Sequence, residues 1–146
     1  MQITVPTVLW LDANSNNENS SFLLKLRDAE NVQTFTEVHA CINYIKTHLQ
    51  QPLFLIVSGT LAVEAVPEIY DLSNVLMVFV FCASMKTYTE WAMDFCEKLL
   101  MFDHEDDLME RLWLQTEEYS QEQAEQYRKH ADLCRERARK FKQSCG

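Results

Sequence analysis

Glycine is almost absent from this chain of 146 residues, which contains only Gly59 and Gly146. The loops that cradle nucleotide phosphates, such as the Walker A loop and the G-x-G-x-x-G turn, need several glycines at fixed spacing. The segment 14–21 is rich in Asn and Ser and precedes a predicted helix, as a flavodoxin phosphate loop does, but Asp12 and Glu18 would repel an anion there. The sequence therefore predicts neither a nucleotide nor a flavin cofactor.

A recognisable metal-binding motif is also missing. The five cysteines are odd in number and include no C-x-x-C pair, a pattern that favours reduced thiols over a disulfide framework. His39 and Cys41 are two residues apart, so on a helix they would point to different faces. We find no partner at metal-ligand spacing for His48, His104 or His130, and we expect no zinc and no other metal.

Long apolar runs are missing as well. No run approaches the roughly 20 apolar residues that cross a bilayer. The N-terminus lacks the charged region followed by an apolar segment that marks a signal peptide. These absences predict a cytoplasmic protein without a membrane partner.

The net charge of −9 is distributed unevenly along the chain. Residues 127–146 contain seven basic side chains against Asp132 and Glu136, whereas the preceding residues hold the acidic excess. Nucleic-acid binding is driven by Lys and Arg at the phosphates, so the overall balance argues against a general nucleic-acid binder. The basic end could instead contact the acidic body of a neighbouring copy, which would make association sensitive to salt.

Short apolar runs alternate with amphipathic stretches over the first 105 residues. Five runs predict strands: Thr7–Leu11, Asn31–Thr36, Leu53–Val57, Val75–Phe81 and Leu99–Phe102. The second run has only Val32 and Phe35 as strong apolar residues, which suits the edge of a sheet. The other runs are apolar without a break, which is typical of parallel strands that are covered on both faces.

The segments between these runs have apolar residues at helical spacing. Helices are expected over about 22–29, 38–49, 61–72 and 87–98. Thr36 is expected to cap the second helix and Pro67 to lie early in the third. We predict an α/β fold of the receiver and flavodoxin-like type: a five-stranded parallel sheet of order 2-1-3-4-5, with helices on both faces and a long C-terminal helix. The expected domains are 1–116 and a charged helical extension, 117–146.

In a doubly wound sheet, ligands bind beyond the carboxyl ends of the strands. The groups expected there are Asp12, Ser58, Cys82 and Asp103, after the first, third, fourth and fifth strands. This pattern resembles the receiver domains of two-component signalling, which hold Mg²⁺ with an acidic pair and phosphorylate an Asp after the third strand. In receivers, a Ser or Thr after the fourth strand and a Lys after the fifth respond to the phosphoryl group. Asp12 matches one of the acidic pair, and Ser58, Cys82 and Asp103 replace the other three groups.

These replacements remove the chemistry of a receiver. A neutral Ser is a poor Mg²⁺ ligand and, without a base, a weak nucleophile. Asp103 adds negative charge where a phosphoryl group needs a cation. Ser58 and His104 lack the glycine motif of an oxyanion hole. We therefore interpret the four residues as vestigial receiver-site positions and expect no catalytic residue, although Asp12 with Asp103 leaves a weak divalent-ion site as an alternative.

The C-terminal segment is the second informative feature. From Asp106 to about Gln143 it contains no Gly or Pro and is dominated by strong helix formers. Beyond Thr116 the apolar content falls, and seven residues there follow a spacing of 3-4-3-4-3-4: Ala124, Tyr127, Ala131, Cys134, Ala138, Phe141 and Cys145. This heptad spacing predicts an interaction helix that pairs with another copy or with a partner protein. A helix hairpin and a solvated helix that leads to a further domain are the alternatives.

Several stretches resemble a domain near the N-terminus of large invertebrate proteins, notably from rotifers, that continue into tetratricopeptide repeats or an arginine-specific ADP-ribosyltransferase domain. The matching residues are Trp10–Asn14, Leu55–Gly59, Val66-Pro67 with Ile69 and Leu72, Val80–Cys82, and Trp91 with Phe95. The catalytic motif of the transferase is absent, because no Glu-x-Glu follows a suitable Arg and Ser-Thr-Ser pattern. The resemblance implies an accessory module.

The sequence thus predicts a non-catalytic, receiver-like interaction or regulatory module of a larger intracellular protein, which self-associates through its C-terminal helix. The rival hypothesis is a ligand-binding or enzymatic domain that uses the rim around Asp12, Ser58, Cys82 and Asp103 for Mg²⁺, a nucleotide or a flavin. An accessory domain of an ADP-ribosyltransferase is a further alternative.

Overall fold

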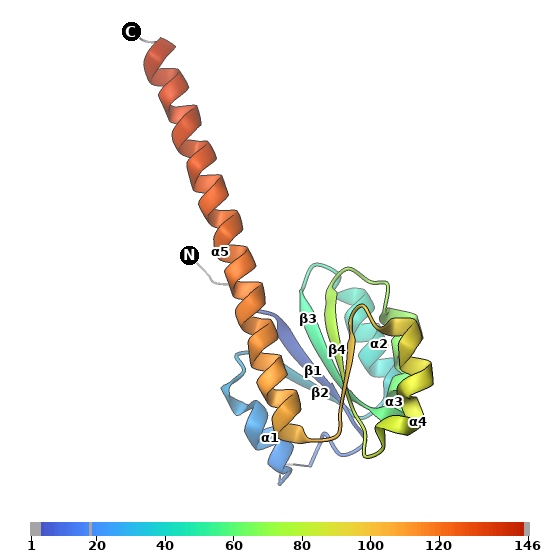
Figure 1. Cartoon of the computed structure of the whole chain (residues 1–146). Coiled ribbons are helices and arrows are strands. Elements are labelled where there is room, and N and C mark those ends of the chain that lie inside the picture. The colour runs from blue at the N-terminus through green and yellow to red at the C-terminus, as the bar shows by residue number, and fades with distance from the viewer. Residues whose placement is uncertain (1–3, 18, 145–146) are drawn as a thin grey trace. The chain divides into compact units, whose positions relative to one another are not determined.

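The structure is a computed structural model that describes residues 4–17 and 19–144 (Figure 1). Its centre is a sheet of five parallel strands in the order β2-β1-β3-β4-β5. The strands are β1 (Thr7–Leu11), β2 (Val32–Phe35), β3 (Leu53–Ser58), β4 (Val75–Phe81) and β5 (Leu99–Phe102). The predicted α/β fold and strand order are confirmed, and the arrangement is flavodoxin-like.

Helices cover both faces of the sheet (Figure 1). They are α1 (Ser21–Lys25), α2 (Val38–Thr47), α3 (Gly59–Ile69), α4 (Met85–Ala92) and α5 (Glu105–Ser144). Short 3-10 turns, Leu26–Asp28 and Met93–Phe95, follow α1 and α4. Helices α2, α3 and α4 pack on one face, and α1 with the first turns of α5 packs on the other.

The alternation of side chains along β1 shows how the two cores form. Leu9 and Leu11 point to the α2–α3 side, whereas Val8 and Trp10 point to the side of α1 and α5. All five residues of β1 are buried, as expected for a strand with neighbours and helices on every side. The edge strand β2 is more exposed, in agreement with its weakly apolar sequence.

The chain forms two compact units, the first ending at Leu112 and the second beginning at Trp113. In the first unit, Leu108, Met109 and Leu112 of α5 are buried in the core that Trp10 also joins. The second unit, which we call the helical unit, is α-helical as far as Ser144. No helix within residues 4–17 and 19–144 has the length and apolar character needed to cross a membrane.

Two local predictions were wrong. The N-cap of α2 is Glu37 rather than Thr36, and it makes no side-chain capping bond. Pro67 lies near the end of α3 because this helix already begins at Gly59. A proline there removes the hydrogen bond to the carbonyl of Val63, which lies on the exposed side of α3, where water can replace the missing donor.

Candidate functional site

The carboxyl ends of β1 and β3 meet at a small cavity of about 170 Å³. Asp12 and Ser58 both line this cavity, and Trp10 and Phe22, which stack with ring centroids 5.0 Å apart, supply apolar walls. The structure thus brings two of the four predicted rim residues together. Cys82 and Asp103 follow the neighbouring strands and do not line this cavity.

Asp12 holds the loop that follows β1. Its Oδ1 accepts a hydrogen bond of 2.9 Å from the backbone N–H of Asn14, which closes an Asx turn. The backbone N–H of Asp12 donates to the carbonyl of Phe35 at 3.0 Å, and the hydroxyl of Ser15 donates to the same carbonyl at 2.8 Å. These bonds explain the polar residues after β1 as loop structure, without a ligand.

Ser58 is the N-cap residue of α3, but its hydroxyl makes no capping hydrogen bond. No hydrogen bond joins this hydroxyl to a base in the described part of the chain. A serine without a hydrogen-bonded base is a weak nucleophile. The local geometry therefore does not activate Ser58.

Cys82 lies after β4, where its backbone N–H donates to the carbonyl of Phe102 at 2.9 Å. Its side chain is buried, and burial raises the pKa of the thiol, with the negative charge of Asp103 adding to the shift. The reactive species of cysteine is the thiolate. Cys82 is accordingly held in its unreactive form.

Lys25 brings a positive charge to this end of the sheet that the sequence analysis overlooked. Its Nζ lies 2.9 Å from Oε2 of Glu105 and 3.0 Å from Oδ1 of Asp106. Hydrogen bonds to these two carboxylates raise the pKa of Lys25. The two acids of α5 therefore neutralise the charge of the ammonium group. Lys25 and these acids line an open hollow, together with Asp103 and His104.

Metal ligands do not cluster at the rim. Within residues 4–17 and 19–144, no group of three or more His, Cys, Asp or Glu side chains is placed to hold a metal ion. The candidate ion site between Asp12 and Asp103 thus gains no third ligand from the fold. Cations such as Mg²⁺ and Ca²⁺ require several oxygen ligands, mainly from carboxylates.

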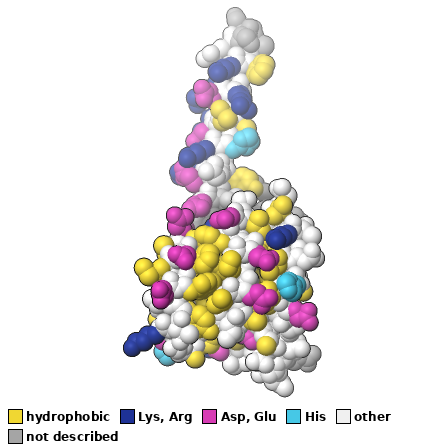
Figure 2. Space-filling model, turned by 90° about the vertical axis from the view of Figure 1, so that its right-hand side faces the viewer, with side chains coloured by type: hydrophobic (Ala, Val, Ile, Leu, Met, Phe, Trp, Pro, Cys, Tyr) yellow, Lys and Arg dark blue, Asp and Glu magenta, His cyan; other side chains and the backbone are white. Residues whose placement is uncertain are grey.

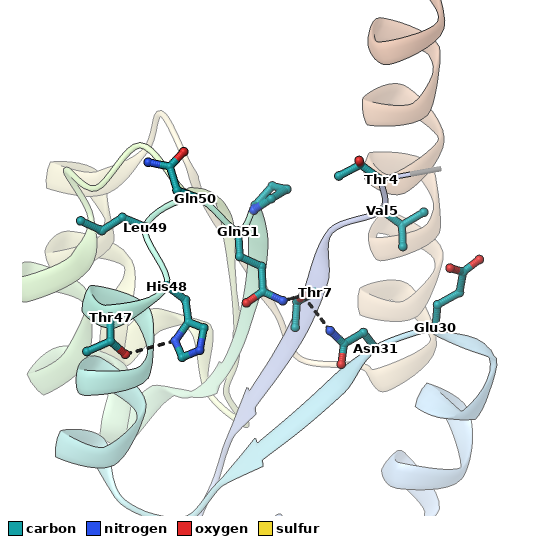
Figure 3. Close-up of a pocket in the computed structure, with 11 residues that line it drawn as sticks. Thr4, Val5, Thr7, Glu30, Asn31, Thr47, His48, Leu49, Gln50 and Gln51 are labelled. Atoms are coloured by element: carbon teal, nitrogen blue, oxygen red, sulfur yellow. Dashed lines mark hydrogen bonds between the residues drawn. The ribbon is translucent and has the colours of Figure 1, made fainter. Parts of the chain in front are cut away.

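A larger, open hollow of about 680 Å³ lies at the other end of the sheet, before β1 and β3 (Figure 3). Its polar groups mainly bond one another. Asn31 Nδ2 donates to Thr7 Oγ1 at 3.1 Å, Gln51 Nε2 donates to the same oxygen, and the hydroxyl of Tyr44 donates to Gln51 Oε1 at 3.1 Å. Ligands of doubly wound sheets bind at the opposite ends of the strands. We therefore assign these polar groups to loop structure.

The surface of the first unit also has an apolar face. Figure 2 shows hydrophobic side chains gathered on one side of the body, with acidic side chains among them. Tyr70 and Trp91 each pack on Phe95, with ring centroids 5.1 Å apart in both pairs, and these rings are only partly buried. These rings pack against the buried core on the α2–α3–α4 side of the sheet, which accounts for apolar residues at these positions. Nothing among the described residues identifies a partner for this face.

The predicted interaction residues all lie on the helical unit, except that Cys145 falls outside the described residues. The other six, which we call the stripe, are exposed: Ala124, Tyr127, Ala131, Cys134, Ala138 and Phe141. Spacings of three and four residues place them on one side of the helix. Basic groups flank the stripe: Arg128, Arg135 and Lys142 on one side and His130 and Arg137 on the other.

One further contact contradicts a prediction from the sequence. His130 Nε2 lies 3.6 Å from Cys134 Sγ, one helical turn away. The interpretation that His130 has no partner at metal-ligand spacing is therefore wrong. A spacing of four residues on a helix is sufficient to bring two metal ligands together.

No family model matches the chain, and no curated protein or solved structure matches it either. The fold is therefore established from the structure alone.

Proposed function

We propose that the chain is a non-catalytic, receiver-like interaction module of a longer intracellular protein, and that it self-associates through the helical unit. The observation that carries this proposal is the stripe, whose two aromatic residues are 51% (Tyr127) and 76% (Phe141) exposed. Exposed aromatic side chains in register along a helix favour burial against another helix. The resemblance to an accessory domain of large invertebrate proteins is in keeping with such a module.

The chemistry of the rim supports the non-catalytic part of the proposal. Ser58 is not activated, the Cys82 thiol is held protonated, and Asp12 is engaged in an Asx turn. Lys25, a cation near the rim, is paired with Glu105 and Asp106. A phosphoryl switch needs an acidic metal site, a phosphoacceptor and a free cation, and none of the groups described here supplies these roles.

The charges of the helical unit favour an antiparallel pair. Residues 113–126 contain four Glu and no basic residue, whereas residues 127–144 contain seven basic side chains against two acidic ones. In a parallel pair, the basic halves would lie side by side, and flanking residues such as His130 and Arg137 would face basic neighbours. In an antiparallel pair, each basic half lies along an acidic half. We therefore propose the antiparallel arrangement.

Light scattering tests the proposal directly. The full chain is measured with a chelator and a reducing agent, so that neither metal nor disulfides join the copies, at about 0.03 M and about 1 M salt. We expect a mass above that of one chain at low salt, and a fall toward it at high salt because the charge pairing is screened.

A shortened chain serves as the control. Removal of residues 117–146 retains the buried residues Leu108, Met109 and Leu112 of α5, so the sheet domain keeps its core. This shortened chain should have the mass of one chain at both salt concentrations. A full chain that is monomeric under all conditions would refute self-association in the metal-free protein.

A further inference from the structure

The side chains of the stripe alternate in size along the helix. One set, which we call the alanine column, repeats every seven residues: Ala124, Ala131 and Ala138. The other set, which we call the large column, repeats at the same interval with larger side chains: Tyr127, Cys134 and Phe141. The side chains on one helix face determine how closely a second helix can approach. The alternation therefore restricts which side chains of the stripe can face each other in a pair of copies.

A parallel pair would pack this alternation poorly. In a parallel pair in register, each side chain of the stripe faces its own counterpart. Tyr127 would face Tyr127 and Ala131 would face Ala131, so crowded layers would alternate with empty ones. Crowded layers strain the packing and empty layers leave cavities, and both lower stability. The sizes of the side chains thus disfavour a parallel pair, independently of their charges.

An antiparallel pair matches large side chains with small ones. Along the stripe, each large side chain follows an alanine after three residues, and the next alanine follows after four. Reversing one helix exchanges these two intervals, so the layers of the two copies coincide only where the alanine column of one faces the large column of the other. Large and small side chains that face each other fill a layer evenly and let the helix axes come close.

The charges of the helical unit narrow the register of this pair. Registers that preserve the layers differ by one heptad, and they place Tyr127 opposite Ala124, Ala131 or Ala138. The two-fold axis lies midway between the facing residues. Opposite Ala138, the axis would fall at residues 132–133, within the basic half, and the two basic halves would lie side by side. Opposite Ala124 or Ala131, the axis falls within residues 125–129, near the boundary between the acidic and basic halves.

We infer that the alanine column is the docking surface for the large column of a second copy, and that the Tyr127 ring of each chain packs on Ala124 or Ala131 of the other. This inference rests on the proposed self-association of the helical unit. It gives the antiparallel direction a basis in packing, in addition to charge. The ring of Tyr127, which is 51% exposed, supplies the apolar area that this contact buries, and the facing alanine supplies the space.

Spin labels on the full chain test the direction of the pair. Glu118→Cys and Glu125→Cys each receive one label, in a chain whose exposed Cys96 and Cys134, and also Cys145, are replaced by serine. Seven residues separate the two positions, so both lie on the same side of the helix. In an antiparallel pair the axial separation of two identical labels grows by about 3 Å per residue away from the axis, and pulsed electron paramagnetic resonance should find a distance greater by about 10 Å or more at position 118. Equal distances at the two positions would indicate a parallel pair and overturn the inference.

Moving the aromatic ring across the pair tests the facing residues. Tyr127→Ala should weaken association about tenfold or more at low salt, because each pair loses two buried rings. In this variant, the ring returns to the same layer from the other copy when the facing alanine becomes tyrosine. Either Ala124→Tyr or Ala131→Tyr should therefore restore association, and the matched control Ala138→Tyr should not. Equal restoration by all three would show that any added ring suffices and would contradict the inference.

The two experiments also separate this inference from the proposed function. A chain that is monomeric at low salt would refute the self-association itself. If the labels show an antiparallel pair but no alanine substitution restores association, pairing by charge stands and the facing of the two columns fails. The labels also locate the axis: an axis at residues 125–126 predicts that Ala124→Tyr restores association, and an axis at residue 129 predicts that Ala131→Tyr does. Disagreement between the axis and the restoring substitution would overturn the inference.

Discussion

The ring of Tyr88 lies directly over Gly59: a β-carbon at position 59 would be 2.7 Å from Cε2 of Tyr88 and 3.1 Å from Cβ of Cys82. This contact joins the start of α3 to α4 at the carboxyl end of the sheet. Gly59 does not have a positive φ, so the requirement for glycine comes from the close approach of the ring and not from the backbone.

Gly59→Ala should therefore destabilise the fold by about 1 kcal/mol, because the half-buried ring of Tyr88 must turn away from its present rotamer. In a Tyr88→Ala background the same substitution should cost much less, since the ring is gone and alanine favours the helix by up to about 1 kcal/mol. Urea unfolding of the four proteins gives the coupling energy between the two sites. An equal cost of Gly59→Ala in both backgrounds would show that the ring is not the obstacle.

The buried thiol of Cys41 should make the stability of the fold depend on pH. The side chain is fully buried on α2, and burial raises the pKa of its thiol from 9.0 to about 12. Below pH 9 the thiol keeps its proton in both states. As pH rises from 9 toward 12 the unfolded chain loses this proton and the folded chain does not, so stability falls by about 1.4 kcal/mol for each pH unit.

Cys41→Ala should lower stability below pH 9 by creating a small cavity, and it should reduce the loss of stability above pH 9. The measurement is the free energy of unfolding in urea at about pH 8 and about pH 10.5 for both proteins. If the two proteins lose the same free energy between these pH values, the Cys41 thiol does not titrate in this way.

Substitutions of Asp12 distinguish the proposed non-catalytic module from the rival ligand-binding domain. Asp12→Asn keeps an oxygen that accepts from the N–H of Asn14, whereas Asp12→Ala removes it. We expect Asp12→Ala to cost about 1 kcal/mol and Asp12→Asn less. Addition of Mg²⁺ should leave the melting temperature of all three proteins unchanged. A rise of several degrees in the original chain, absent from both variants, would favour a cation site at the rim.

The sheet could be predicted because the apolar composition of each strand reflects how deeply that strand is buried. Val75–Phe81 is apolar throughout, as a strand covered on both faces requires. In β2, only Val32 and Phe35 are strongly apolar, and this is sufficient to place it at an edge. The position of Pro67 could not be predicted in the same way, because it depends on α3 beginning at Gly59.

The rim was predicted only in part. The strand order predicts that the carboxyl ends of β1 and β3 lie side by side, and Asp12 and Ser58 do line one cavity there. Lys25 was missed because its partner Glu105 is 80 residues away in the sequence. The contact of His130 with Cys134 is local, and a search for ligands four residues apart would have found it.

The central claim is that two copies meet through the stripe, and a single comparison of masses tests it. Ala131→Glu places a charge within the stripe, whereas Leu133→Glu places the same charge on another side of the same helical turn, at a residue that is 40% exposed. Sedimentation at low salt should show that Ala131→Glu is monomeric while Leu133→Glu associates like the original chain. Association that survives Ala131→Glu, or that both substitutions abolish equally, would contradict the account.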